Sequence, residues 1–310
     1  MPNAHKEITW RGQLEGMAFA APYLIGLAVF VVIPLVLSLY LSGTEYPMLT
    51  APMWIGLDNY RALLHDPIFH QALRNTLFYA AGSVPLTLAA SVGLALLLNQ
   101  KVPGRAIFRT IIFLPSLVPA VAGAMLWLWV LNGQDGLLNV LLRAGYRLVT
   151  FGGAGGGAGG GPKLPSYLTH ESWVLPIFIL LTLYSVGNAV IIFLAGLQDI
   201  PTELYESAEL DGASGWRRLI HITLPMLSPV IFFNLIMGII GSWQVFTLPQ
   251  IMVGPNVNRA GYFYSMYIFD SAFMQQRMGY ASAMAWIQFL IVLSLTLLVM
   301  WTSKRWVHYR

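Results

Sequence analysis

Six stretches of this chain contain no Asp, Glu, Lys or Arg over more than about twenty residues, the length that a helix needs to cross the hydrocarbon core of a membrane. With 57% hydrophobic and only 10% charged residues, the chain of 310 residues is also too apolar for an ordinary water-soluble domain. The charge-free stretches are Gly16–Thr44, Asn75–Gln100, Thr110–Gln134, Ser172–Gln198, Leu219–Asn258 and Met278–Ser303. The first is too long for the core of a signal peptide, so we expect it to be retained. The pattern predicts an all-α membrane protein with six transmembrane helices.

The predicted spans alternate with segments that hold the charged residues. We expect membrane-spanning helices over residues 16–44, 75–100, 110–134, 173–198, 226–253 and 278–303. The remaining segments are the N-terminal residues 1–15, the loops 45–74, 135–171, 199–225 and 254–277, and the tail 304–310. With a cytoplasmic N-terminus, ten of the seventeen Lys and Arg residues fall in the inside segments, at a higher density than in the longer outside loops. Both termini and loop 199–225 are therefore expected in the cytoplasm, and loops 45–74, 135–171 and 254–277 outside.

Composition and motifs exclude several classes of function. The sequence has no cysteine, and therefore no disulfide, thiolate chemistry or cysteine metal site. Its net charge of +4 comes from residues beside the predicted spans, so membrane lipid and not nucleic acid is the expected partner. The glycine-rich run at 152–162 precedes Lys163, Leu164 and Pro165 and lacks the Ser or Thr of a phosphate-binding loop, which favours a flexible linker. We expect no cofactor on this chain.

Loop 199–225 is the most informative segment, because five of the thirteen acidic residues lie in it between long apolar stretches. Ionised groups are costly inside hydrocarbon, so this loop must lie in water at the membrane surface. Pro201 suits a first helical turn, and Gly212 suits a helix end. Ser214 is expected to cap a second helix that carries Trp216 and two arginines. The loop is predicted to be a helix, a glycine bend and another helix.

The order of residues in this loop resembles the EAA signature of binding-protein-dependent ABC importer permeases of the carbohydrate type, similar to the maltose, glycerol phosphate and lactose permeases. The matching residues are Glu206, Ser207, Ala208, Asp211, Gly212, Ala213, Leu224 and Pro225. Ser207 stands where the family usually has alanine, which exchanges one small residue for another. Segments 54–60 and 113–119 also resemble the family, and the likeness covers nearly the whole chain. The alternative is a solvated, amphipathic loop such as any membrane protein carries.

The resemblance implies the architecture of a type I ABC importer permease in a prokaryotic cytoplasmic (inner) membrane. In that family the EAA loop is a cytoplasmic coupling helix that docks on an ATPase, so ATP and Mg²⁺ would bind to a partner chain. This chain would then be a transporter subunit without catalytic residues of its own. The implied partners are a second permease subunit, two ATP-binding subunits and an extracytoplasmic solute-binding protein, with a homodimer of this chain less favoured.

The candidate substrate pathway is neutral, because the predicted spans carry amide, hydroxyl and aromatic side chains in place of charges. The candidate residues are Tyr184, Ser185, Asn188, Ser242, Trp243 and Gln244, with Asn234 and Gln288 nearby in the sequence. Tyr184 and Asn188 are four residues apart and are expected to share one helix face. Amides and hydroxyls bond sugar hydroxyls, and an aromatic ring covers a pyranose face. The alternative role of such residues is to bond one helix to another.

Three other functions remain open. A permease for glycerol phosphate or another polyol would share the architecture. A secondary transporter that works alone would be favoured by inverted repeats or by ionisable groups in the spans, and neither is seen in the sequence. Proton coupling is therefore disfavoured, whereas a sodium site made of carbonyl and hydroxyl oxygens stays open. A membrane-embedded enzyme would need a cluster of nucleophiles or metal ligands, which is also missing from the spans.

Overall fold

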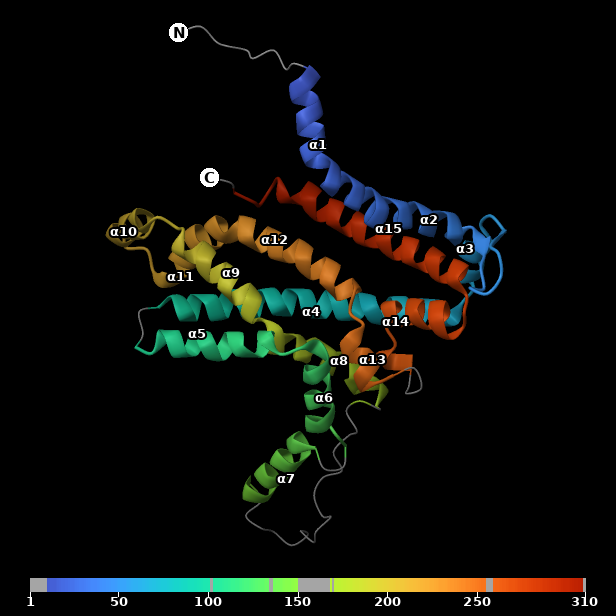
Figure 1. The fold of residues 1–310 in the computed structure, drawn as a ribbon. Helices are drawn as coiled ribbons and strands as arrows, with labels where there is room; N and C mark the ends of the chain where they lie inside the picture. The colour runs from blue at the N-terminus through green and yellow to red at the C-terminus, as the bar shows by residue number, and fades with distance from the viewer. Residues whose placement is uncertain are drawn as a thin grey trace. The chain divides into compact units, whose positions relative to one another are not determined.

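The computed structural model describes residues 10–100, 103–133, 136–149, 168, 170–254 and 259–308. These residues are mainly helical (Figure 1), and the two short strands β1 (Thr44–Glu45) and β2 (Met53–Trp54) pair antiparallel, with Thr44 opposite Trp54. The chain divides into two compact units. Unit 1 comprises residues up to His65 together with Ile268–Ile287, and unit 2 comprises Asp66–Tyr267 and Gln288–Arg310.

Four described helices are long and apolar enough to cross a membrane, and there are up to six spans if each of two bent helix pairs counts as one. The four are Gly16–Ser42, Pro67–Asn99, Gly215–Met252 and Met278–Ser303, and the bent pairs are Arg105–Leu117 with Ala120–Val130 and Glu171–Ser185 with Gly187–Gln198. Six spans with both termini inside therefore remain a prediction. The glycine-rich run at 152–162 lies outside the described residues.

Unit 1 is built around the turn that follows the first long helical segment. That segment comprises α1 (Trp10–Leu27), the π-helix η1 (Ala28–Val32) and α2 (Ile33–Ser42), and the hairpin and α3 (Asp58–Leu64) follow it. The Asn59 amide donates to the carbonyl oxygens of Ser42 and Thr44, both at 2.9 Å. Trp54 stacks on Tyr40 with ring centroids 5.7 Å apart. Segment 54–60 thus fixes the end of α2, which is a structural role.

The C-terminal part of unit 1 packs on the same turn. It contains the π-helix η6 (Asp270–Met274) and the first turns of α15 (Met278–Ser303). The backbone N–H of Met278 donates to the Tyr46 carbonyl at 3.0 Å, and a Cβ on Gly279 would collide with the Thr44 carbonyl oxygen. Helix α15 therefore begins at a position where only glycine fits against the hairpin.

Unit 2 contains a helical bundle around α4 (Pro67–Asn99), which packs against α8 (Glu171–Leu181), α9 (Gly187–Gln198) and α12 (Leu224–Trp243) and runs alongside α5 (Arg105–Phe113) (Figure 1). Asp66 caps α4, because its carboxylate accepts a 2.8 Å hydrogen bond from the Ile68 N–H, and Pro67 occupies the first turn. The helix begins eight residues before the predicted start of the span at Asn75.

The loop before α14 (Tyr264–Phe269) is fixed to α4 by two buried polar side chains. Asn75 donates to the carbonyls of Arg259 and Tyr262, in the 3₁₀ turn η5 (Arg259–Gly261) and just after it, at 2.8 and 3.0 Å. Thr76 Oγ1 accepts from the Tyr264 N–H at 2.9 Å. Burial raises the pKa of the Tyr264 phenol above its usual value. These bonds satisfy backbone groups that helices leave without partners.

The two bends have different causes. In the first, the 3₁₀ turn η2 (Leu114–Leu117) ends at Val118, whose extended backbone is the conformation expected before Pro119, and α6 (Ala120–Val130) leaves at 98°. In the second, the 3₁₀ turn η3 (Thr182–Ser185) separates α8 from α9 by 52°. Gly187 follows this break, and a Cβ there would lie 2.7 Å from the Ile112 carbonyl oxygen. The prolines in the sequence predict the first bend, whereas the second depends on a tertiary contact, the close approach of Gly187 to α5.

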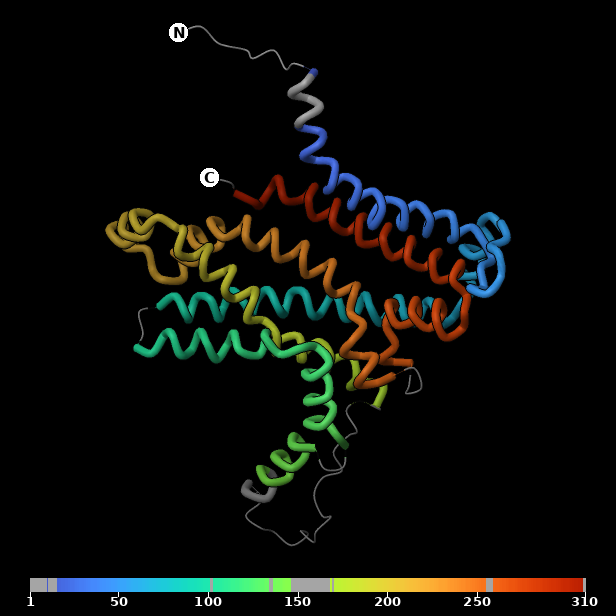
Figure 2. Tube along the Cα trace, in the orientation of Figure 1, coloured from blue at the N-terminus to red at the C-terminus, as the bar shows by residue number. Residues whose placement is uncertain are grey.

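The other described elements of unit 2 lie in its connections. They are α7 (Leu137–Val149), α10 (Thr202–Leu210), α11 (Gly215–Arg218), the π-helix η4 (Leu219–Thr223) and α13 (Thr247–Met252). Figure 2 traces α9 into the turn formed by α10 and α11 and back into α12. The core beneath that turn contains Leu197, Ile200 and Leu227, which are at least 95% buried.

Candidate functional site

The acidic loop folds into a helix, a glycine bend and a second helix. Helix α10 begins at Thr202, so Pro201 lies one position earlier than expected, at the N-cap. The helix ends at Leu210 with Asp211 as its C-cap, and Gly212 follows with a left-handed backbone at a φ of +72°. The Gly212 N–H donates to the Glu209 carbonyl at 3.0 Å, and the Ala213 N–H donates to the Ala208 carbonyl at 2.8 Å. These two bonds form a Schellman motif, which favours glycine at the left-handed position.

One local prediction is wrong. Ser214 lies at the N-cap of α11 with the expected extended backbone, but its side chain makes no capping hydrogen bond. The first turn has its regular helical hydrogen bond, in which the Arg218 N–H donates to the Ser214 carbonyl at 3.0 Å. The helix then passes through η4 into α12.

The residues that match the EAA signature occupy different environments. Glu206 and Ser207 are exposed on α10, and Asp211 is the exposed C-cap. The Ser207 hydroxyl donates to the Glu203 carbonyl at 2.5 Å, which keeps this polar side chain within its own helix. Leu224 and Pro225 open α12 immediately after the π-helix. The signature therefore combines an exposed helix with the turns that anchor it.

Sequence reasoning missed one prominent feature of this loop, the side chain of Leu210. It is 90% exposed at the end of α10, beside the acidic residues. A single exposed leucine is common on protein surfaces. Its position at the tip of a helix that already resembles a docking element is the signal that could have identified it.

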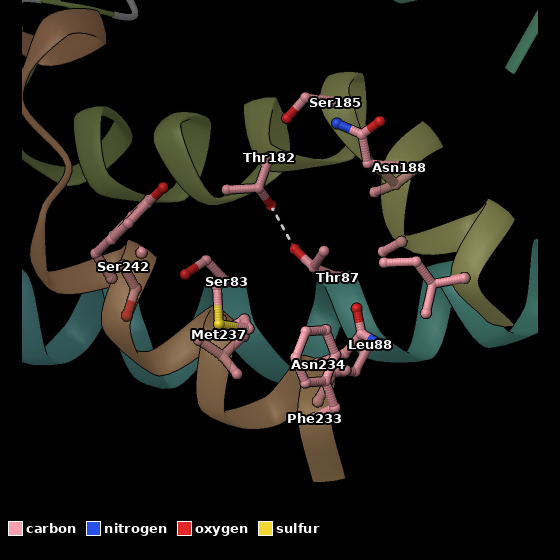
Figure 3. Close-up of a pocket in the computed structure, with 17 residues that line it drawn as sticks. Ser83, Thr87, Leu88, Thr182, Ser185, Asn188, Phe233, Asn234, Met237 and Ser242 are labelled. Atoms are coloured by element: carbon pink, nitrogen blue, oxygen red, sulfur yellow. Dashed lines mark hydrogen bonds between the residues drawn. The ribbon is translucent and has the colours of Figure 1, made fainter. Parts of the chain in front are cut away.

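A pocket of about 510 Å³ lies in unit 2 between α4, the break before α9, and α12 (Figure 3). The described residues that line it include no Asp, Glu, Lys, Arg or His. Its polar lining residues are Ser83, Thr87, Thr182, Ser185, Asn188, Asn234 and Ser242, together with Tyr79. Thr87 donates to Thr182 across the pocket at 3.2 Å, and Thr182 donates to the Ile179 carbonyl at 2.6 Å. The pocket is therefore lined by neutral hydrogen-bonding groups among apolar side chains.

The structure brings three of the six predicted pathway residues into this lining, namely Ser185, Asn188 and Ser242. Tyr184 instead meets the edge of the Trp127 ring, with centroids 5.5 Å apart. It does not share a continuous helix face with Asn188, because η3 ends between them. The expectation of a shared face is wrong for that reason.

Trp243 and Gln244 are not among the described lining residues either. Trp243 is 1% exposed and packs edge to face on Tyr264, while its carbonyl accepts from the Gln288 amide at 2.9 Å. Gln244 is the exposed C-cap of α12. Sequence reasoning also missed Ser83 and Thr87 on α4, which line the pocket and lie four residues apart in an apolar helix.

Within the described part of the chain, no three His, Cys, Asp or Glu side chains gather into a group that could hold a metal ion. The site thus consists of a solvent-exposed helical loop and a neutral pocket, joined by α12. Such an arrangement provides binding groups and a mechanical connection.

Comparison with known proteins finds a matching family and several relatives. Residues 86–308 match the family described as "Binding-protein-dependent transport system inner membrane component". The chain is 40% identical over 307 residues to the probable ABC transporter permease protein YesP of Bacillus subtilis, covering 96% of this chain and 93% of YesP. It is 31% identical over 299 residues to the lactose transport system permease protein LacF of Rhizobium radiobacter, covering 94% of each.

A solved structure has a similar fold over nearly the same length. It is the crystal structure of a bacterial ABC transporter involved in the import of the acidic polysaccharide alginate. The TM-score is 0.79 at 25% identity, and the alignment covers 95% of this chain and 96% of that chain.

Proposed function

The chain belongs to the family of inner membrane components of binding-protein-dependent transport systems, and we propose that it is the permease subunit of an ATP-driven importer for a neutral sugar or oligosaccharide. We infer the class of cargo from the pocket, whose described lining residues offer hydroxyl and amide groups and no charge. The family is one of multi-pass membrane proteins that are not themselves enzymes. LacF, which serves lactose transport, is similar to this chain over nearly its whole length.

The chemistry of the pocket supports a neutral cargo over an acidic one. Sugar hydroxyls both donate and accept hydrogen bonds, and the lining offers serine and threonine hydroxyls and the amides of Asn188 and Asn234, which do the same. A carboxylate, sulfonate or phosphate in a mostly apolar pocket requires a cationic partner. A permease for glycerol phosphate is therefore supported less well than one for a neutral sugar. A secondary transporter driven by protons is also disfavoured, since the described lining has no ionisable acid or base.

The coupling role rests on α10. An exposed helix that carries Glu206 and the 90% exposed Leu210 fits into a cleft of a soluble protein, where the leucine becomes buried and the acidic side chain finds a partner. The Schellman turn at Gly212 holds this helix at a fixed angle to α11. We infer that α10 docks on an ATPase subunit, which binds ATP and Mg²⁺ while this chain binds neither.

The proposed assembly has five chains. A second permease subunit completes the pathway, with a homodimer as the less favoured form. Two ATP-binding subunits dock from the cytoplasm, and a solute-binding protein delivers the cargo from outside. ATP binding closes the ATPase pair, moves α10 and changes which side of the membrane the pocket faces, so that transport follows an alternating-access cycle.

Reconstitution of the complex tests the proposed function. The tagged complex is placed in proteoliposomes with ATP inside and its binding protein outside, and the uptake of labelled lactose, arabinooligosaccharides, an alginate oligosaccharide and glycerol phosphate is compared. We expect ATP-dependent uptake of a neutral saccharide alone. Uptake of the acidic saccharide or of glycerol phosphate at a comparable rate would contradict a neutral cargo, and uptake without ATP would contradict the importer.

A further inference from the structure

Two hydrogen bonds in series connect α10 to the helix that leads into the membrane. The phenol oxygen of Tyr205 lies 3.0 Å from Oγ1 of Thr223, and this Oγ1 donates to the carbonyl oxygen of Arg218 at 3.3 Å. A threonine hydroxyl has one proton to donate. Because that proton goes to the Arg218 carbonyl, Tyr205 is the donor to Thr223. The series therefore runs from a side chain on α10 to the backbone at the junction of α11 and η4.

This connection is partly shielded from water. Thr223 is 4% exposed, and Tyr205 is partly buried against the core that contains Leu197 and Ile200. A buried hydroxyl that loses its partner pays the full cost of desolvation, so the bond persists while the two elements move together.

A second connection joins the same two elements at the surface. Arg218 Nη1 lies 3.2 Å from Oε2 of Glu209, with the two side chains 31% and 73% exposed. Exposed ion pairs contribute little because water and salt screen them. The buried series through Tyr205 is therefore the stronger of the two connections to residue 218.

The second bond of the series spans the π-helix η4 (Leu219–Thr223), because it joins Thr223, the last residue of η4, to Arg218, the residue before η4. A π-helix accommodates an extra residue in an α-helix and is frequently found at functional positions. Here it precedes Pro225, which has no N–H to donate to the preceding turn. The helix register can change at this point at low cost.

The helix beyond η4 reaches the pocket without another break. Asn234, on α12, lies eleven residues after Thr223, about 16 Å along a helix axis. Met237, Gly241 and Ser242 line the pocket from the same helix. A displacement of Thr223 is thus transmitted to the pocket wall by one continuous helix, in which Pro229 removes one backbone hydrogen bond.

We propose that Tyr205 is a positioning residue, which transfers movement of α10 through Thr223 and the π-helix η4 to the pocket face of α12. This inference rests on the proposed function, since it requires an ATPase docked on α10. Loss of the phenol hydroxyl leaves α10 docked and the ATPase active but separates hydrolysis from the movement of α12.

The absence of cysteine from the sequence provides a test that needs no knowledge of the cargo. Met237→Cys places a single thiol on the pocket face of α12, and its reaction with a fluorescent maleimide is measured in the purified complex with its ATPase and binding protein. Labelling rates are compared with and without ATP and vanadate, and ATP hydrolysis is measured on the same samples. Tyr205→Phe and Thr223→Val remove the series, whereas Thr223→Ser keeps the hydroxyl. Tyr60→Phe is the matched control, because its phenol bonds Ser42 in unit 1 at 2.8 Å.

We expect ATP and vanadate to change the labelling rate in the parent, Thr223→Ser and Tyr60→Phe proteins. In Tyr205→Phe the change in labelling rate caused by ATP and vanadate should be about fivefold smaller, the equilibrium factor for one ordinary hydrogen bond, and ATP hydrolysis should be unchanged. An undiminished change in Tyr205→Phe would overturn the inference. So would a parallel loss of assembly, hydrolysis and labelling change, which would indicate a role in folding alone. If the parent complex shows no ATPase, the proposed function itself fails, and the inference fails with it.

Discussion

The backbone N–H of Ala213 donates a 2.8 Å hydrogen bond to the carbonyl oxygen of Ala208 across the left-handed Gly212. This bond closes α10 and sets the direction in which the chain enters α11. It also accounts for the glycine of the signature, because glycine is the residue that most freely adopts the left-handed backbone required at this position.

Substitution of Gly212 tests this turn. Gly212→Ala should destabilise the left-handed conformation by about 1–2 kcal/mol, although a Cβ there would meet no atom within 4 Å. We expect lower ATP-driven uptake while the amount of chain in the membrane is unchanged. Gly215→Ala is the control, because Gly215 is equally uncrowded and has no positive φ. Equal uptake by the two variants would count against a strained turn.

Leu210 provides a test of docking. Leu210→Ser should reduce the recovery of the ATPase with the tagged chain, since a fully buried leucine contributes about 1.5–3 kcal/mol. Leu49→Ser is the matched control, with an exposed fraction of 82% for Leu49 against 90% for Leu210. Quantitative co-purification measures the effect. Undiminished recovery of the ATPase with Leu210→Ser would mean that this side chain stays in water.

Asn188 should contribute more to cargo binding than Asn234 does. Both line the pocket, but the Asn234 amide donates to the Val230 carbonyl at 2.9 Å, whereas the side chain of Asn188 makes no hydrogen bond with any described residue. Asn188→Leu should therefore raise the KM for uptake about tenfold, the cost of one lost polar contact with a sugar hydroxyl. Asn234→Leu should have the smaller effect, and ATP hydrolysis should persist in both. The opposite order of the two KM values would argue against this assignment of the lining.

Gly187 holds the second bend against α5. A Cβ at this position would lie 2.7 Å from the Ile112 carbonyl oxygen and 2.9 Å from the Phe113 Cα, so Gly187→Ala should destabilise the chain by about 1–3 kcal/mol. Gly93→Ala is the control, because Gly93 lies within α4 and a Cβ there would meet no atom within 4 Å. Thermal unfolding in detergent should show a lower midpoint for the first variant alone. A shared midpoint would show that α5 and α9 separate readily.

The sequence was sufficient to predict the helical membrane class and the position of the exposed loop, because charge is so unevenly distributed along the chain. It also predicted the glycine bend at Gly212, since glycine is the residue type that adopts a positive φ most freely. The prediction of a Ser214 cap was wrong, because this side chain accepts no hydrogen bond from the first turn of α11. The π-helix η4 has no periodic signature in the sequence and was not expected.

The pocket was predicted only in part. Ser185, Asn188 and Ser242 were identified by polarity, but polarity does not distinguish a lining residue from one that bonds a neighbouring helix. Tyr184 was misplaced because the break at η3 depends on the contact of Gly187 with α5, which is distant in the sequence. Ser83 and Thr87 became recognisable only when α4 was seen beside α9 and α12.

The most direct test of the central claim is affinity purification of the tagged chain from its native membrane in mild detergent, followed by identification of the proteins recovered with it. An importer permease should bring with it an ATPase and a second permease subunit, and the purified assembly should hydrolyse ATP. A stable chain that transports a sugar in proteoliposomes without any ATPase would contradict the account.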